Sequence, residues 1–194
     1  MPDREFNNPK ELQDFAKERF DIYFNEEVIT GRSAKFSIGN DIYSPEPDVA
    51  VGPFAKTRKY IDRYSCMAEK SIDFIEMCII FHESNLKEHH ILLGGLPCFE
   101  NFYNDGVNWN ARCFVAVEIE NKPPTIKHVL GSTLNAIALG RVGLLVGFSE
   151  DTVRKFLRCL KYLDFLKSVR KSNIEFKNGL VLSKDQFIDI LKNI

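Results

Sequence analysis

The chain has 194 residues, of which 44% are hydrophobic and 27% charged, so it is long enough for one globular domain with a substantial core. Its formal net charge of -1 excludes a global attraction to nucleic acid or anionic lipid, and any such binding requires a local patch. Five cysteines without a C-x-x-C pair argue against a disulfide framework or a structural zinc site. The N-terminus has no apolar signal region and no stretch has spanning length, which favours a cytoplasmic protein without membrane attachment.

The first half of the chain predicts helices and two short strands. An apolar stripe predicts a helix over residues 9–27. Two strands are expected at 34–38 and 48–51, separated by residues typical of turns. A longer helix is expected over 62–88, and the Gly- and Asn-rich segment 91–110 reads mostly as loop.

The second half predicts a strand, a helix and a second strand in succession. Residues 112–120 form an apolar strand that two prolines end, and residues 126–140 have helical spacing. The apolar run 141–148 suits a strand buried on both faces. The passage 112–147 is therefore expected to be a right-handed parallel crossover.

The C-terminal part predicts a helix over residues 149–169 and a weak hairpin around Asn178-Gly179. Ser183 and Gln186 form a capping box for a last short helix. The whole order favours an α/β or α+β domain, with helices on both faces of a central mixed β-sheet.

One strand end carries an unusual set of charges. Side chains alternate along a strand, so Glu118, Glu120 and Lys122 share one face of the strand 112–120. Unpaired charges are costly to bury, so these groups must be compensated by each other or by a cation.

These residues have a counterpart upstream, where Asp48 follows Pro47 at the start of a predicted strand. Pro47-Asp48 together with Glu120-Asn121-Lys122 resembles the PD-(D/E)xK nuclease superfamily, which has the restriction-endonuclease-like fold. The core order of that fold is a helix, three strands, a helix and a strand, which fits residues 9–147. Asp48 and Glu120 are 72 positions apart, farther than in compact members, so the resemblance requires an insertion between them.

The resemblance implies one restriction-endonuclease-like domain over 1–194, with its core at about 9–150. A helical insertion then occupies about 60–90, and a C-terminal helix and hairpin extension occupies about 150–194.

The resemblance also implies a site for magnesium or manganese. Asp48 and Glu120 would bind the metal, and Lys122 would orient the attacking water or stabilise the developing charge. An acid from the first helix often completes such a site, for which Glu18 is the first candidate and Glu11 the second.

The remaining residues leave alternatives open. Glu118 could be an outer ligand or the partner of a basic residue. Alternatively, Glu120 and Lys122 are a solvated strand end and Asp48 is a turn residue.

A basic run interleaved with tyrosines could grip a phosphate backbone, or it could be a solvated helix start; its basic residues are Lys56, Arg58, Lys59 and Arg63. The basic residues of the helix 150–171 offer a second such face, or ordinary surface.

The expected function is metal-dependent hydrolysis of phosphodiester bonds, with DNA as the expected partner and RNA open. Cleavage of both strands would need a homodimer or two sequential nicks. The alternative is a degenerate nuclease-like domain that binds nucleic acid or protein as a regulatory module.

Overall fold

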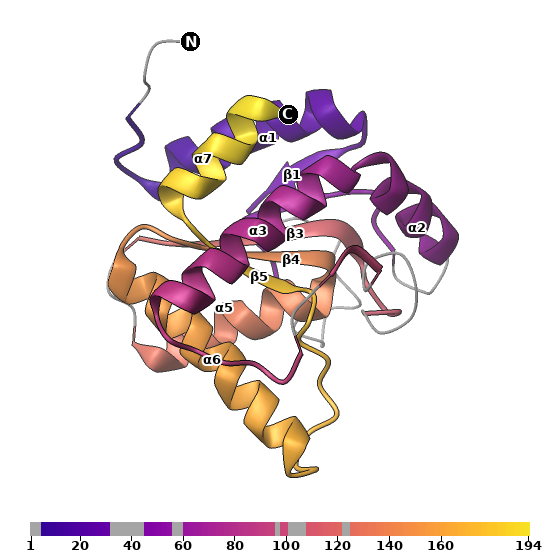
Figure 1. Cartoon of the computed structure of the whole chain (residues 1–194). Helices are drawn as coiled ribbons and strands as arrows, with labels where there is room; N and C mark the ends of the chain where they lie inside the picture. Colours follow the sequence, from indigo (N-terminus) through magenta and orange to yellow (C-terminus); the bar gives the residue numbers. More distant parts are fainter. Residues whose placement is uncertain (1–4, 32–44, 56–59, 96–97, 101–107, 122–124) are drawn as a thin grey trace.

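The computed structural model describes residues 5–31, 45–55, 60–95, 98–100, 108–121 and 125–194 (Figure 1). Helices and strands alternate irregularly along the chain. In order they are α1 (Pro9–Phe24), β1 (Val28–Thr30), β2 (Val49–Val51), α2 (Ile61–Lys70), α3 (Ile72–Glu88), β3 (Cys113–Glu120), α5 (Ile126–Leu139), β4 (Gly140–Gly147), α6 (Glu150–Ser168), β5 (Gly179–Ser183) and α7 (Lys184–Asn193).

The five strands form one mixed sheet in the order β1-β2-β3-β4-β5. The pairs β1-β2 and β2-β3 are antiparallel, whereas β3-β4 and β4-β5 are parallel. Helix α5 connects the two parallel strands β3 and β4, as the sequence predicts. Helices α1, α3 and α7 lie on one face of the sheet and α5 and α6 on the other (Figure 1). The predicted α/β class with a mixed sheet is therefore confirmed.

The sheet is buried on both faces, and alternate residues of each strand serve different cores. The core on the α1, α3 and α7 side takes Val115, Val117, Ile119, Val142, Leu144, Val146, Leu180 and Leu182. The core on the α5 and α6 side takes Leu145 and Val181. Among the described residues, no helix combines the length and the apolar character needed to cross a membrane.

Two predictions near the N-terminus need correction. The helix expected over 9–27 ends at Phe24, because Asn25 adopts a left-handed conformation with φ of 49°. The chain then forms strand β1 at Val28–Thr30, a strand that was not predicted, directly after the end of the predicted helix. The strand predicted at 34–38 lies outside the described residues.

The helix predicted over 62–88 is two helices that meet at Ser71. The Ser71 N–H donates to the carbonyls of Met67 (3.0 Å) and Ala68 (3.2 Å), and its hydroxyl donates to Met67 O at 2.6 Å. These bonds complete the last turn of α2 and allow α3 to start in a new direction.

The hairpin predicted around Asn178-Gly179 is wrong, because β5 pairs in parallel with β4. Asn178 is fully buried, and its side-chain amide donates to the carbonyls of Ile137 (2.9 Å) and Gly140 (3.0 Å). It thereby fastens the start of β5 to the end of α5. The capping box of Ser183 and Gln186 is confirmed at the start of α7.

Strand β5 is at the edge of the sheet, and helix α3 covers its free backbone groups. The Val181 N–H donates to His82 Nδ1 at 3.0 Å, and Asn85 Nδ2 donates to Val181 O at 2.9 Å. The edge is therefore closed against pairing with another chain. Burial lowers the pKa of His82 from 6.5 to about 4, so the imidazole is neutral in the folded protein at pH 7.

This pKa predicts how stability depends on pH. Unfolded His82 takes up a proton near pH 6.5 but folded His82 only near pH 4, so the free energy of unfolding should fall as the pH drops through this window. In His82→Gln the amide oxygen can still accept the Val181 N–H, so the fall measured by urea denaturation should be smaller by up to about 3 kcal/mol. His128→Gln, at an exposed position on α5, is the control. Equal pH profiles for wild type and His82→Gln would contradict the assignment.

Candidate functional site

The predicted acids gather at one end of the strands. The parallel strands β3, β4 and β5 have their carboxyl ends on this side of the sheet, and the antiparallel strand β2 begins there. Val49 pairs with Val117, so the antiparallel register brings Asp48 beside Glu118. Electrostatic coupling links Asp48 with Glu118 and with Glu120. We call these three side chains the carboxylate cluster.

Asp48 is held by donors from two different elements. Its Oδ2 accepts the backbone N–H of Ile119 at 2.7 Å, and its Oδ1 accepts Gln13 Nε2 at 2.9 Å. Ile119 belongs to β3 and Gln13 to α1. One carboxylate therefore ties the start of β2 to the neighbouring strand and to the first helix.

Helix α5 holds the other two carboxylates. Glu120 Oε1 accepts Ser132 Oγ at 2.7 Å, and the side chain of Asn135 hydrogen-bonds the Glu118 carboxyl. Ser132 and Asn135 are three residues apart and so lie on one face of the helix. Glu118 is only 7% exposed, and its Oε1 finds no hydrogen-bond partner among the described residues.

The protonation of the cluster follows from this burial. Burial is the main cause that raises the pKa of Glu118 well above its usual range, and the neighbouring Asp48 raises it further while Asn135 opposes the shift. Burial also raises the pKa of Asp48, against the lowering effect of the Ile119 N–H. All the donors just described are neutral. None of the ion pairs among the described residues includes a member of the cluster.

The predicted metal ligands on α1 stand apart from these contacts. Glu18 is exposed, and it is five residues beyond Gln13, which places it about 140° around the helix. Glu11 Oε2 accepts the backbone N–H of Asn7 at 3.2 Å, next to the helix start. The α1 residue that contacts Asp48 is Gln13, and a metal-ligating role for Glu18 stays a prediction.

Of Lys122 and the predicted basic run, the structure describes one residue, Arg63. Lys122, and Lys56, Arg58 and Lys59 of the basic run, lie outside the described residues. Arg63 is described and forms an ion pair with Glu26.

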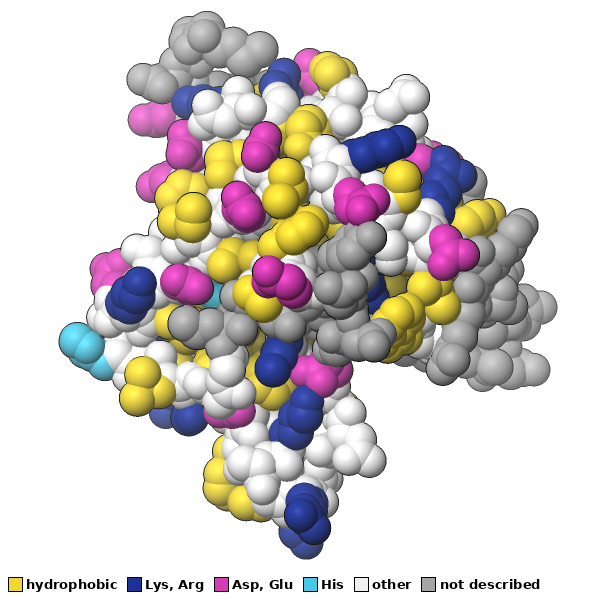
Figure 2. Space-filling view, turned by 45° about the vertical axis from the view of Figure 1, so that its right-hand side comes forward, with side chains coloured by type: hydrophobic (Ala, Val, Ile, Leu, Met, Phe, Trp, Pro, Cys, Tyr) yellow, Lys and Arg dark blue, Asp and Glu magenta, His cyan; other side chains and the backbone are white. Residues whose placement is uncertain are grey.

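The basic residues of α6 are partly neutralised by nearby acids. The ion pairs are Lys155 with Asp151 (2.7 Å), Lys161 with Asp164 (3.0 Å) and Lys167 with Glu175 (2.5 Å). On the face shown in Figure 2, Lys and Arg side chains are scattered among acidic ones and form no single patch.

The cluster offers carboxylate oxygens, which are the ligands that a hard divalent cation prefers. The unpartnered, buried Glu118 Oε1 is an oxygen that such an ion could use. Within the described parts of the chain, however, no three His, Cys, Asp or Glu side chains converge closely enough to hold a metal ion as they stand. Each Asp48 oxygen accepts one hydrogen bond and keeps a further lone pair, so these two bonds leave room for a cation at the same carboxylate.

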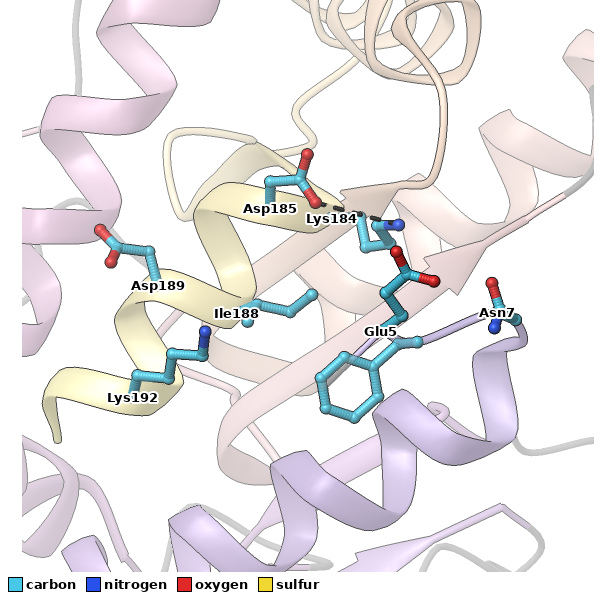
Figure 3. A pocket seen from close by; sticks show the side chains of 8 residues that line it. Glu5, Asn7, Lys184, Asp185, Ile188, Asp189 and Lys192 are labelled. Carbon is cyan, nitrogen blue, oxygen red and sulfur yellow. Dashed lines mark ion pairs between the residues drawn. The ribbon is translucent and has the colours of Figure 1, made fainter. Parts of the chain in front are cut away.

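A separate groove of about 510 Å³ lies between the segment that precedes α1 and helix α7 (Figure 3). Its charged lining has both signs, and Lys184 pairs with Asp185 at 3.9 Å. The lining includes no member of the carboxylate cluster, and its mixed charge points to no particular ligand.

Sequence reasoning missed Gln13, Ser132 and Asn135. The two α5 residues did leave a signal, because they are polar and three positions apart in a helix that is otherwise mostly apolar. Comparison of the chain with protein-family models, curated proteins and solved structures finds no match.

The raised pKa of Glu118 predicts the effect of removing its charge. A protonated Glu118 stabilises the fold below the unfolded pKa of 4.5, and this contribution is lost as the pH rises toward the higher folded value. Glu118→Gln mimics the protonated acid at every pH. We expect its Tm to equal that of wild type at pH 4.5 and to exceed it at about pH 7.5 in the absence of divalent ions.

Glu69→Gln, which changes an exposed carboxylate on α2, is the matched control and should leave the Tm difference near zero. A Glu118→Gln protein less stable than wild type at about pH 7.5 would show that the charged carboxylate is favourably compensated.

Proposed function

We propose that the protein is a metal-dependent nuclease that hydrolyses phosphodiester bonds through the carboxylate cluster. The observation that carries the proposal is the gathering of Asp48, Glu118 and Glu120 at one end of the strands with only neutral donors described around them. Such an arrangement lowers the stability of the fold unless a cation neutralises part of the charge, so the folded protein would gain stability by binding one.

The fold supports a restriction-endonuclease-like assignment. Helix α1, strands β1, β2 and β3, helix α5 and strand β4 follow the order that the family resemblance implies, with β1 at Val28–Thr30 in the place given to the strand predicted at 34–38. The pair α2 and α3 stands between β2 and β3, which accounts for the long interval between Asp48 and Glu120.

The proposed chemistry assigns a role to each acid. A bound divalent ion would polarise the phosphate and lower the pKa of a water molecule. Asp48 and Glu120 would hold that ion, with Glu118 Oε1 as a further oxygen. From the sequence alone, Lys122 is assigned to the attacking water and the developing charge.

The proposed substrate is DNA, with RNA as the second possibility. The net charge of -1 gives no general attraction to either, so backbone contacts must come from a local basic segment. The basic run that includes Arg63 is the first candidate, and a homodimer would place two sites on one duplex.

Asp48→Asn tests the proposal directly. The amide keeps the shape and an oxygen that can accept the Ile119 N–H, but it removes the charge. Wild type should gain about 2.7 kcal/mol of stability at a magnesium or manganese concentration about 100 times its Kd. Asp48→Asn should lose most of this gain and most cleavage of mixed DNA and RNA substrates. The measurements are Tm with and without each ion, and a gel assay of cleavage.

A second candidate is a binding module that keeps the fold without the chemistry. It is favoured by the two hydrogen bonds that give Asp48 a structural role, because they join the start of β2 to β3 and to α1. A wild-type protein that shows neither an ion-induced Tm shift nor cleavage would exclude the nuclease and leave this candidate.

Gln13→Lys separates a functional cluster from a structural one. An ammonium group beside Asp48 Oδ1 would offset the negative charge that the neutral amide leaves in place. We expect the Tm without divalent ions to rise, and the ion-induced rise in Tm to be lost, because the lysine competes with the ion. Such an exchange of function for stability is typical of active sites.

The matched control is Asp21→Asn, which changes the net charge by the same amount at an exposed position on the same helix and should alter neither quantity. Loss of the ion response in Glu18→Gln would instead assign Glu18 to the metal, as the family resemblance implies.

A further inference from the structure

The outer half of α6 exposes apolar side chains on a basic background. Tyr162, Phe165 and Val169 are each about half exposed, and they follow Arg158 at helical spacing along one face. Residues 154–171 include seven basic residues and one acidic residue. Figure 1 shows that this part of α6 projects beyond the sheet. We call Arg158, Tyr162, Phe165 and Val169 the basic stripe.

The charge and the apolar surface of the basic stripe together define the partner that it fits. Lys155, Lys161 and Lys167 form ion pairs with neighbouring acids, whereas Arg158 forms none with any described residue. A row of exposed apolar side chains marks an interaction site, unlike single scattered ones. The partner must offer apolar side chains within an acidic surface, because complementary charge favours association and like charge opposes it.

The outer face of α3 has this chemistry. Asp73, Glu76 and Ile80 follow helical spacing and are exposed, Ile80 to 64%. We call these three residues the acidic stripe. Neither acid of the stripe forms an ion pair with a described residue, whereas Glu83 pairs with Lys87 at 3.9 Å. Figure 2 shows hydrophobic side chains lying among acidic ones on the upper half of this face, over α1 and α3.

The end of α1 adds apolar surface beside the acidic stripe. Phe24 of α1 packs against Phe74 of α3, with ring centroids 5.4 Å apart. The same turn of α1 exposes Asp21 and also Ile22, which is 67% exposed. An acid and an apolar side chain therefore continue the chemistry of the acidic stripe onto a second helix.

We propose that the basic stripe of one chain docks on the acidic stripe of a second copy, in a head-to-tail arrangement. Helices α3 and α6 cover opposite faces of the sheet, so each docked copy keeps one stripe for the next (Figure 1). Such a contact closes into a ring or continues as a chain. Pairing of two basic stripes is disfavoured, because it would set like charges against each other. The inference is independent of the proposed nuclease activity.

Nucleic acid is disfavoured as the occupant of the basic stripe. The centre of the stripe is apolar, and three of the lysines on the helix are already paired with acids. Helix α6 begins just after Gly147, which pairs with Glu120 at the carboxylate cluster. Its 19 residues then run about 28 Å away from that end. A strand bound at the outer half of α6 would therefore lie far from the cluster.

Sedimentation velocity of the full chain over a concentration series tests the docking. Wild type should associate as its concentration rises, and added salt should weaken the association because the paired charges are at the surface. Arg158→Glu and Glu76→Lys should each weaken it at least about tenfold, since each sets like charges opposite each other. Phe165→Gln, which leaves the charge unchanged, should also weaken it.

A mixture of the two charge-reversal variants is the decisive sample. The altered basic stripe of Arg158→Glu then meets the altered acidic stripe of Glu76→Lys, and the two unaltered stripes also match. We expect the mixture, and a chain that carries both substitutions, to associate as wild type does. Lys127→Glu, at an exposed position on α5, is the matched control and should leave the association unchanged. The Tm of each variant shows that it is folded.

Several results would overturn the inference. One is a wild-type protein that stays monomeric at about 1 mM. Another is an association that only one of the two reversals weakens, that neither weakens, or that the mixture does not restore. Weaker binding of single-stranded DNA by Arg158→Glu, with a monomeric wild type, would assign the basic stripe to nucleic acid instead. Cleavage and the ion-induced change in Tm are measured separately, so the proposed function can fail without the docking and the docking without the function.

Discussion

The hydrogen bond from the Ile119 N–H to Asp48 Oδ2 is the contact on which the site depends, because it joins the start of β2 to the end of β3. It brings one carboxylate beside two others, although like charges repel and burial disfavours the charged form of each. Among the described residues, the groups that contact the cluster and reduce this cost are neutral donors: Gln13 from α1, and Ser132 and Asn135 from α5. With the Ile119 N–H of β3, donors from three separate elements therefore contact this one group of acids.

The fold tolerates such a cluster because its core is large and lies on both faces of the sheet. In the absence of an ion, the raised pKa of Glu118 lets a proton reduce the charge. A proton and a divalent ion would then compete for the same carboxylates. The cluster would destabilise the fold least when either the proton or the ion is bound. Burial of the apolar core offsets the local destabilisation that the cluster causes.

The sequence predicted what depends on local periodicity and could not predict what depends on distant partners. Alternation along β3 placed Glu118 and Glu120 on one face, and the crossover through α5 to β4 was also readable. By contrast, the break at Ser71 depends on a side-chain bond to α2, and Asn178, typical of a turn in sequence, is held by the carbonyl of Ile137, 41 positions away. The contact between Gln13 and Asp48 spans 35 positions, and no local pattern encodes it.

Helix α3, between β2 and β3, contributes to the whole domain and does more than separate two acids. Helix α3, which lies in this interval, supplies His82 and Asn85 to the backbone of Val181 at the far edge of the sheet. The same helix buries Phe74 and Ile75 in the core that α1 and α7 share. A compact version without this interval would bring Asp48 and Glu120 closer in sequence but would leave β5 as an uncovered edge. The long interval between Asp48 and Glu120 weakens the family resemblance in the sequence, but it contains the helix that covers the edge strand β5.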